Sequence, residues 1–504
     1  MKATLNSLSS PNGEPTIKRI LEWLVVAQGR AIDGEDADRL LSHLLLLRDS
    51  PTPPAQRIKI LDLLFKQAER VVEAELARLR DISLPVSRKT RLRVKLILDL
   101  LKALTQDYFN TLADLFDPKV ENTLHTPHLS LRQAMRAISW QIGICHLVAA
   151  PPPLGLWQQL HAAFRNARRL GIENFPAPRG GANLQRVYTN ILLAAIAQPA
   201  SFSSVELKFI SDYIEQSPLS VELLESPPLD SSTLFWIDLD RDFPAHALIR
   251  RAPSADSQVI YFSCAAHASE AARQHAELLK GVPAAALGLA DFADTHAGQG
   301  VLFRLAALWG QPVKRKFARR RQSYRAKLCW GLDNLWKLIR TPEADVEQSE
   351  WMVTNESPDG YAMMHVSGQT VGLRIGDIVA LQSLEDQAET PPLLHVCIIR
   401  WAISENPEHV ELGLELITSR AIAAEIAQAE AQAGKIAALI LPETPPLRPN
   451  ESLVVPSGFL KENLGRIVVM VEEGNLKIRE VRTNQLSEQT SAVEVFSVSP
   501  DDSA

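Results

Sequence analysis

The sequence predicts a multidomain α + β protein. An N-terminal α-helical region, either solenoid-like or a bundle, precedes an antiparallel β-barrel and a second, small C-terminal β domain. Apolar residues recur every three or four positions in the first part of the chain, which is typical of helices, and later at every second position, which is typical of strands. The 504 residues suit about three domains of roughly 150 residues each. A composition of 46% hydrophobic and 22% charged residues indicates a globular chain.

Residues 1–230 are expected to form the helical region. Leucines recur at every fourth position from Leu92 to Leu104, and a second apolar stripe from Trp157 to Ala167 precedes Gly171, which is expected to end that helix. Proline-rich breaks separate the helical stretches. No strict repeat period is present, so an α-solenoid of tetratricopeptide type and an irregular bundle both stay open.

Residues 231–310 change character. Leu234–Leu239 and Val259–Ser263 read as strands, and Ala268–Leu279 reads as a helix. The pattern favours a small α/β segment or an extension of the helical region.

Residues 313–420 are expected to form a basic linker followed by the barrel. The linker, Val313–Lys327, contains eight Lys or Arg among 15 residues and no acidic residue. Period-two patterns then predict at least five strands: Trp351–Thr354, Tyr361–Val366, Asp377–Gln382, Leu393–Ala402 and His409–Ile417. Sequential antiparallel strands in this number favour closure into a barrel.

The alanine-rich stretch Arg420–Ala433 is expected to be a helix. Residues 434–504 then return to strand patterns and form the second, smaller β domain. The expected strands are Ile436–Leu441, Ser452–Val455, Arg466–Val471, Lys477–Val481 and Val493–Val498.

Two short motifs occur in order within the barrel region. Arg320-Arg321-Gln322-Ser323-Tyr324-Arg325 contains the pattern R-x-x-x-R, and Asn355-Glu356-Ser357-Pro358-Asp359-Gly360 fits [D/N]-x-S-x-x-G in a turn between two expected strands. With the downstream patterns Leu373–Asp377, Ile399–Trp401 and Leu412–Leu416, they resemble the signatures of the PilZ family. The resemblance covers residues 313–420 only.

The resemblance implies a receptor for cyclic di-GMP. Carried over residue by residue, Arg321 and Arg325 would be the paired arginines and Arg320 would occupy the position before them. Asn355, Ser357 and Gly360 would form the barrel half of the site. A second R-x-x-x-R pattern, Arg315 to Arg319, overlaps the same stretch and leaves the register of the motif open.

The residue types suit this ligand, which carries two phosphates and two guanines. A guanidinium binds a phosphate or the O6 and N7 atoms of guanine through two hydrogen bonds. The Asn355 amide offers a donor and an acceptor to a base edge, and the Ser357 hydroxyl can bond phosphate or base. Gly360 permits a tight turn and close approach of the ligand. Two acidic residues, Glu356 in a position that is usually apolar in the family and Asp359, depart from this pattern because they repel an anion.

Three functions remain in view. The first is a cyclic di-GMP receptor that couples nucleotide binding to a protein partner held by the helical region. The second is a degenerate PilZ scaffold or chaperone-like adaptor that binds proteins and no nucleotide. The third, a nucleic-acid binder using the basic stretch, is disfavoured because only Phe317 and Tyr324 interleave the charges and the formal net charge is −6.

Other classes of protein are disfavoured by missing patterns. No run of 18 apolar residues predicts membrane insertion, and the polar start Met1–Pro15 does not resemble a signal peptide, so a cytoplasmic location is expected. Four scattered cysteines predict reduced, buried thiols. Asp238–Asp242 begins like a calcium loop but lacks the required glycine and glutamate, so no metal site is expected. No catalytic motif is present, and neither enzyme activity nor a cofactor is expected.

Overall fold

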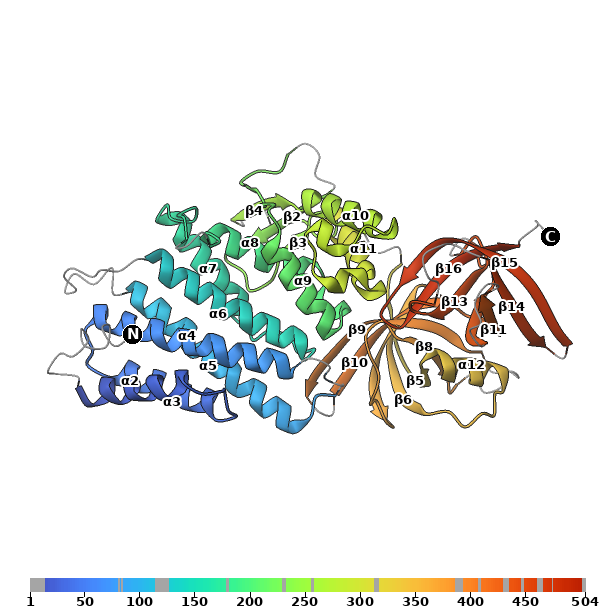
Figure 1. Cartoon of the computed structure of the whole chain (residues 1–504), viewed down its shortest axis with the longest axis horizontal. Coiled ribbons are helices and arrows are strands. Elements are labelled where there is room, and N and C mark those ends of the chain that lie inside the picture. Colours follow the sequence, from blue (N-terminus) through green and yellow to red (C-terminus); the bar gives the residue numbers. More distant parts are fainter. Residues whose placement is uncertain are drawn as a thin grey trace. The chain divides into compact units, whose positions relative to one another are not determined.

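The computed structural model (Figure 1) describes most of the chain. The described residues are 14–79, 82, 85–113, 127–177, 181–228, 233–254, 258–311, 317–385, 393–406, 409–428, 435–445, 448–459, 466–473 and 475–500. They divide into two compact units, the first made of helices and a small sheet, the second of helices and two β-barrels.

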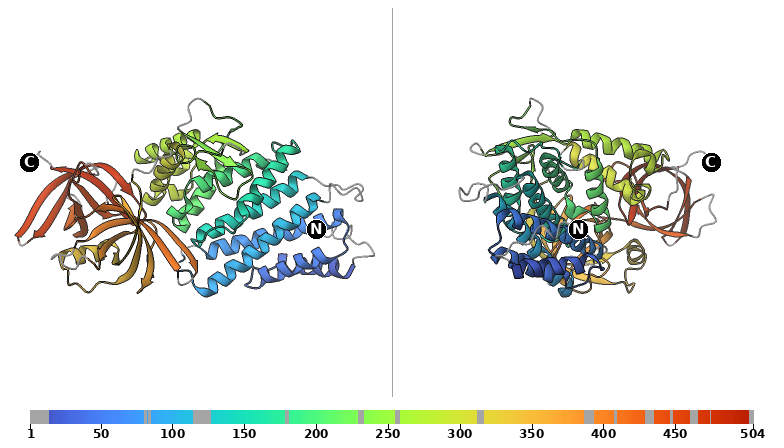
Figure 2. Two further views of the ribbon diagram at one scale, coloured as in Figure 1. Left: turned by 180° about the vertical axis from the view of Figure 1, so that it is seen from behind. Right: turned by 60° about the vertical axis from the view of Figure 1, so that its left-hand side comes forward.

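The first unit contains seven of the described α-helices, each of which contacts the next along the chain (Figure 2). They are α2 (Glu14–Gln28), α3 (Asp36–Asp49), α4 (Pro54–Arg78), α5 (Arg88–Ala113), α6 (Pro127–Leu147), α7 (Leu156–Arg169) and α8 (Leu184–Ile196). This stacking of sequence neighbours is compatible with a solenoid-like arrangement.

The apolar stripes of these helices form the core of the unit. In α7, the stripe from Trp157 to Ala167 is buried as expected, and Gly171 follows the helix with a φ of 66°. In α5, the predicted stripe is buried in part. Leu100 and Leu104 are buried as expected, whereas Leu92 is 62% exposed and Val94 and Ile97 are buried.

A four-stranded antiparallel sheet completes the first unit. Its strands are β1 (Leu223–Leu224), β2 (Leu234–Asp238), β3 (His246–Ala247) and β4 (Val259–Ser263), in the order β1-β4-β2-β3. Both long strands lie where the sequence predicts them. The buried imidazole of His161 on α7 bonds the hydroxyl of Tyr188 (2.8 Å) and the carbonyl oxygen of Phe243 (2.9 Å), which ties two helices to the loop after β2.

The second unit contains the remaining described helices. They are η3 (Pro199–Ser201), α9 (Ser204–Gln216), α10 (Ala265–Leu279), η4 (Ala284–Leu287), η5 (Asp291–Asp294), α11 (His296–Gly310) and α12 (Leu332–Arg340). A reciprocal pair of bonds between Ser203 and Glu206 caps α9. Arg304 of α11 binds the Glu206 carboxylate and so joins α11 to the start of α9. None of the helices in the described ranges is both long and apolar enough to cross a membrane.

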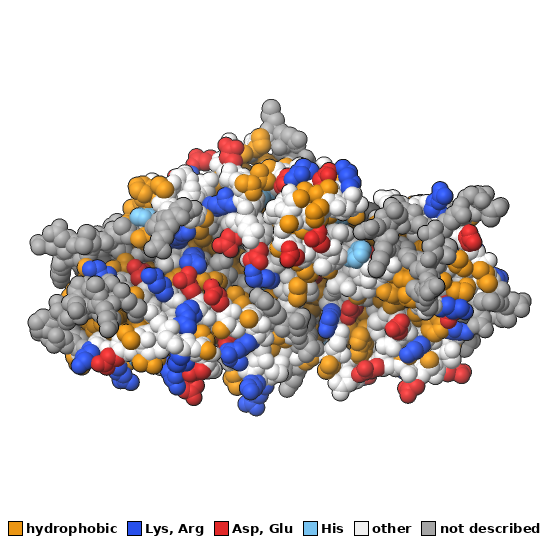
Figure 3. Space-filling model, in the orientation of Figure 1, with side chains coloured by type: hydrophobic (Ala, Val, Ile, Leu, Met, Phe, Trp, Pro, Cys, Tyr) orange, Lys and Arg blue, Asp and Glu red, His pale blue; other side chains and the backbone are white. Residues whose placement is uncertain are grey.

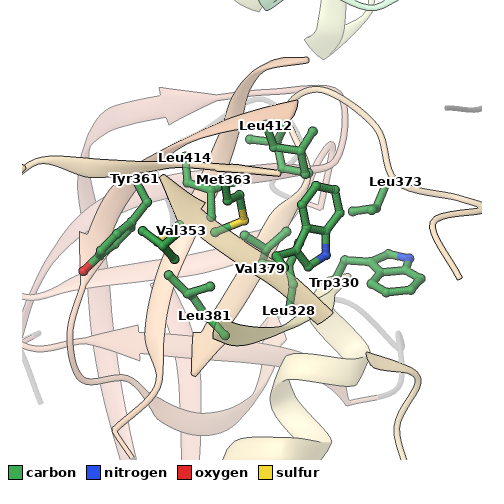
Figure 4. Close-up of a cluster of buried hydrophobic side chains, with 14 of the residues drawn as sticks. Leu328, Trp330, Val353, Tyr361, Met363, Leu373, Val379, Leu381, Leu412 and Leu414 are labelled. Atoms are coloured by element: carbon green, nitrogen blue, oxygen red, sulfur yellow. The ribbon is translucent and has the colours of Figure 1, made fainter. Parts of the chain in front are cut away.

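The first barrel is closed and antiparallel. Its strands are β5 (Arg320–Trp330), β6 (Gln348–Ser357), β7 (Gly360–Ser367), β8 (Ile378–Ser383), β9 (His395–Asn406) and β10 (His409–Thr418), in the order β10-β7-β6-β5-β8-β9. Figure 4 shows side chains of β5, β6, β7, β8 and β10 meeting inside it, namely Leu328, Val353, Met363, Val379 and Leu414. All five predicted strands are present, and β5 is a sixth.

The second barrel is also closed. It comprises β11 (Ile422–Gln428), β12 (Ile436–Leu441), β13 (Ser452–Pro456), β14 (Arg466–Glu473), β15 (Asn475–Gln489) and β16 (Val493–Pro500), in the order β11-β12-β13-β16-β15-β14. With the strands of each barrel numbered one to six along the chain, both barrels have the same circular order, 1-2-3-6-5-4. The C-terminal region therefore repeats one topology.

The predicted helix Arg420–Ala433 is wrong over residues 422–428, which form strand β11; residues 429–433 lie outside the described residues. Ala424 and Ile426 alternate with more exposed neighbours and pack into the second core. Pairing with β12 and β14 outweighs the helix propensity of alanine. Between the barrels, Leu335 of α12 packs in one cluster with Val396 of the first barrel and Val454 of the second.

Candidate functional site

The predicted arginines lie on a strand and not on a linker. Arg320, Arg321 and Arg325 belong to β5, and all three are exposed. The second half of this strand anchors it, since Ala326 and Leu328 point into the core of the first barrel. The polar first half has no alternation of apolar and polar residues, and for this reason the sequence predicted a linker there. Arg315 of the alternative register lies outside the described residues.

Strand pairing brings the two motifs together. Arg321 is the direct cross-strand partner of Asn355, and Arg320 is the partner of Glu356, between β5 and β6. Directly opposite residues have Cβ atoms roughly 5 Å apart, so one small ligand group can contact both. The register shifts between Arg321 and Tyr324, which places a β-bulge between the two arginines of the motif. A bulge increases local twist and re-aims side chains.

The turn of the second motif is a two-residue hairpin loop between β6 and β7. Ser357 is 8% exposed, and its hydroxyl hydrogen-bonds both Asp359 Oδ1 (2.6 Å) and the Gly360 carbonyl oxygen (3.1 Å). Because the hydroxyl has one proton, one of the two contacts takes the proton at a time. Ser357 therefore holds the hairpin, and it is not open to solvent as a surface hydroxyl would be.

Gly360 is required by the neighbouring strand. A Cβ at this position would lie 2.0 Å from the carbonyl oxygen of Leu414 on β10. The backbone N–H of Leu416 also donates to the carbonyl oxygen of Asp359 at 2.9 Å. The glycine therefore lets the hairpin dock on β10, whereas the sequence suggested that it gives the ligand access to the backbone.

Carboxylates lie beside the donors of the site. Arg325 Nη1 donates to Glu350 Oε1 at 2.6 Å, and Ser367 donates to the other oxygen of Glu350 at 3.3 Å. The hydrogen bond from Arg325 is the main cause that holds the pKa of Glu350 below its ordinary value. Tyr324 donates to Glu356 at 3.3 Å.

Two aromatic side chains that the motifs do not include complete this end of the barrel. The hydroxyl of Tyr361 is 2.6 Å from Nδ1 of His395, and the two rings stack with centroids 5.7 Å apart. Burial raises the pKa of Tyr361 above its ordinary value. In the sequence, Tyr361 immediately follows the second motif, and His395 lies on the same strand face as Cys397 and Ile399. Only these positions could have indicated that the two residues belong to this part of the barrel.

The remaining family-like patterns have structural roles. Gly376 adopts a φ of 91° in the turn before β8 and donates to the carbonyl oxygen of Ile399. Gly413 on β10 pairs with Trp401 on β9, and its missing side chain makes room for the Trp401 indole. Arg400 connects the barrels, because its guanidinium binds Glu415 of β10 and Glu488 of β15.

The acidic segment Asp238–Asp242 has a structural role. The carboxylate of Asp242 accepts hydrogen bonds from the backbone N–H groups of Gly155 and Gln158, at the start of α7. Asp240 pairs with Arg165. Within the described ranges, no cluster of three or more His, Cys, Asp or Glu side chains is arranged to bind a metal. Figure 3 shows basic and acidic side chains intermixed over the face it presents, which does not favour binding to a nucleic-acid backbone.

The helical region is similar to a known protein family. The model of that family matches residues 18–227 and is described as the N-terminal domain of the cyclic-di-GMP receptor FimW. The match covers less than half of the chain and lies in the helical region, apart from the barrel that carries the motifs. No curated protein matches the sequence.

Proposed function

We propose that the chain is a receptor for cyclic di-GMP and that its first barrel is a PilZ-type domain carrying the ligand site. One observation carries the proposal: β5 and β6 pair in a register that sets Arg321 opposite Asn355. The exposed arginines of the first motif thereby lie beside the partly buried Asn355 of the second. The description of the family that matches the helical region names a receptor for the same nucleotide, which is independent support because it concerns different residues.

Each residue has a role that suits its surroundings. Arg321 and Arg325, both exposed on β5, hold a phosphate or a guanine edge through paired hydrogen bonds. Arg320 adds a third guanidinium at the same end of the strand. Asn355 reads a base edge with its amide. Ser357 and Gly360 act indirectly, since they fix the hairpin that positions Asn355.

Ligand binding would act on the start of β5. A nucleotide that bridges the arginines and the hairpin would hold the polar first half of β5 against β6. In this proposal the helical region binds a protein partner, and ligand binding at the barrel regulates that interaction. As a receptor for a second messenger made inside the cell, the protein would act in the cytoplasm as a binding protein without catalysis.

A second candidate function is an adaptor that binds protein and no nucleotide. It is favoured by one specific observation: Arg325 and Ser357 already bond carboxylates of the barrel itself. In this alternative the motif residues stabilise the barrel only.

Isothermal titration of the full chain with cyclic di-GMP separates the two candidates. Arg321→Ala and Arg325→Ala each remove a charge-assisted contact and are expected to weaken binding about 10- to 100-fold. Lys327→Ala is the matched control, because Lys327 is an exposed cation on the same strand outside the motif. Wild-type affinity in a folded Arg321→Ala/Arg325→Ala variant would reject the site, and no binding by the wild type would favour the adaptor.

A further inference from the structure

The proposed site contains acidic groups that contact its own donors. Glu350 accepts a hydrogen bond from the guanidinium of Arg325 at 2.6 Å, and Asp359 accepts one from the hydroxyl of Ser357 at 2.6 Å. Arg321 differs from Arg325, since the structure shows no ion pair between Arg321 and a described residue. One arginine of the motif is thus open to an anion, and the other is engaged.

The engaged carboxylate is held in place. Glu350 uses one oxygen for Arg325 and the other for Ser367, so it is oriented from two strands, β5 and β7. The guanidinium of Arg325 presents its donors in a fixed planar fork, and a phosphate needs the same fork for a two-point contact. A phosphate at Arg325 must therefore displace the Glu350 carboxylate or share the fork with it.

Asp359 acts at the other end of the site. It stands in the two-residue loop that follows Ser357, and its backbone is fixed to β10 by the bond from Leu416. The hydroxyl of Ser357 holds its carboxylate at the hairpin loop. An anionic ligand that approaches the hairpin meets this carboxylate, and the like charges repel.

We infer that Glu350 and Asp359 act as intramolecular competitors of the ligand and set the concentration at which the site fills. The inference rests on the proposed function and concerns its regulation. A ligand that contacts several donors at once can compensate for displacing Glu350. An anion with a single phosphate contacts fewer donors and is excluded more strongly. The carboxylates therefore lower affinity and raise selectivity together.

Charge-removing amide variants test the inference in the full chain. Glu350→Gln and Asp359→Asn keep the shape and an acceptor oxygen but remove the negative charge. Each is expected to tighten cyclic di-GMP binding about two- to fivefold, which is the range for exposed ion pairs. Glu347→Gln is the matched control, because Glu347 is exposed and contacts no described arginine; it should change affinity less than twofold. GMP serves as the single-phosphate probe, and its binding should increase more than that of cyclic di-GMP in Glu350→Gln.

The outcomes separate this inference from the proposed function. Weaker binding by Glu350→Gln would overturn it, because Glu350 would then position Arg325 productively. Equal tightening by Glu350→Gln and Glu347→Gln would also overturn it, since only net charge would matter. In both cases the losses caused by Arg321→Ala and Arg325→Ala would still support the receptor. If neither the wild type nor any variant binds, the receptor and the competitor roles both fail.

Discussion

Replacing Arg400 with methionine is expected to loosen the connection between the two barrels. Arg400 lies on β9, and its side chain is only about a quarter exposed, at 26%. Its Nε donates to Glu415 at 2.6 Å, while its two terminal nitrogens donate to both oxygens of Glu488 at 2.8 and 2.6 Å. The methionine keeps most of the aliphatic stem and removes the guanidinium, so the substitution isolates the charge interactions.

The expected cost follows from the burial of the three charged groups. Removing one partner of a fully buried ion pair costs about 3–5 kcal/mol, because the remaining charge is left uncompensated. Glu488 is 20% exposed and Glu415 is 49% exposed, so solvent recovers part of that cost. We therefore expect a loss of about 2 kcal/mol in the free energy of unfolding of the barrels.

Urea unfolding followed by tryptophan fluorescence measures this loss, since three of the nine tryptophans, Trp330, Trp351 and Trp401, lie in the first barrel and contribute to its transition. A double-mutant cycle with Glu488→Gln assigns the coupling to the Arg400–Glu488 pair. Arg325→Met is the matched control, since the Arg325 side chain is 56% exposed and its pair with Glu350 should matter much less to stability. A loss for Arg400→Met no greater than that for Arg325→Met, or no coupling to Glu488, would refute the reasoning.

Three further substitutions test other parts of the barrel. Burial raises the pKa of Asp377 to about 6, so the folded state binds this proton more tightly than the unfolded chain. Its stabilising effect is complete below a pH of about 4 and is lost as pH rises through about 6; Asp377→Asn should flatten this trend in melting temperature, and an unchanged trend would assign it to another group. Gly413→Ala places a Cβ 1.8 Å from an atom of the Trp401 ring and should cost about 1–3 kcal/mol in urea unfolding, whereas Gly143→Ala, in open space on α6, should be neutral or stabilising. Equal effects of the two would contradict the packing argument. Gly360→Ala meets the carbonyl oxygen of Leu414 and should lower both the melting temperature and cyclic di-GMP affinity; normal stability with normal affinity would show that the hairpin does not need β10.

The fold was largely predictable wherever the regularly spaced apolar residues of the sequence are also the residues buried in the structure. The five expected strands of the first barrel and the five of the second are present, since each contributes apolar residues to a barrel core. The helix predicted at residues 420–433 was an error caused by alanine, which favours helices and is uncommon in strands. Ile422 and Ile426 are the only large apolar residues on the inward face of β11. The polar first half of β5 has no alternation of apolar and polar residues. Its strand structure is therefore seen only from its pairing with β6.

The site was predictable in part for a related reason. The motif residues and their order are visible in the sequence, and the pairing of Arg321 with Asn355 brings them together. The pairing of Arg325 with Glu350 was not predictable, because it depends on a bulge that shifts the register between Arg321 and Tyr324. The bond between Tyr361 and His395 joins β7 and β9, which are far apart in the chain, and only the closed barrel brings them together.

Hydrogen–deuterium exchange of the full chain, with and without saturating cyclic di-GMP, tests the location of the ligand site most directly. If the first barrel binds the nucleotide, amides in residues 320–330 and 352–361 should exchange more slowly in its presence. The same regions should show no change in the Arg321→Ala/Arg325→Ala variant. Protection confined to residues 18–227, with the barrel unchanged, would contradict the assignment and place the ligand on the helical region instead.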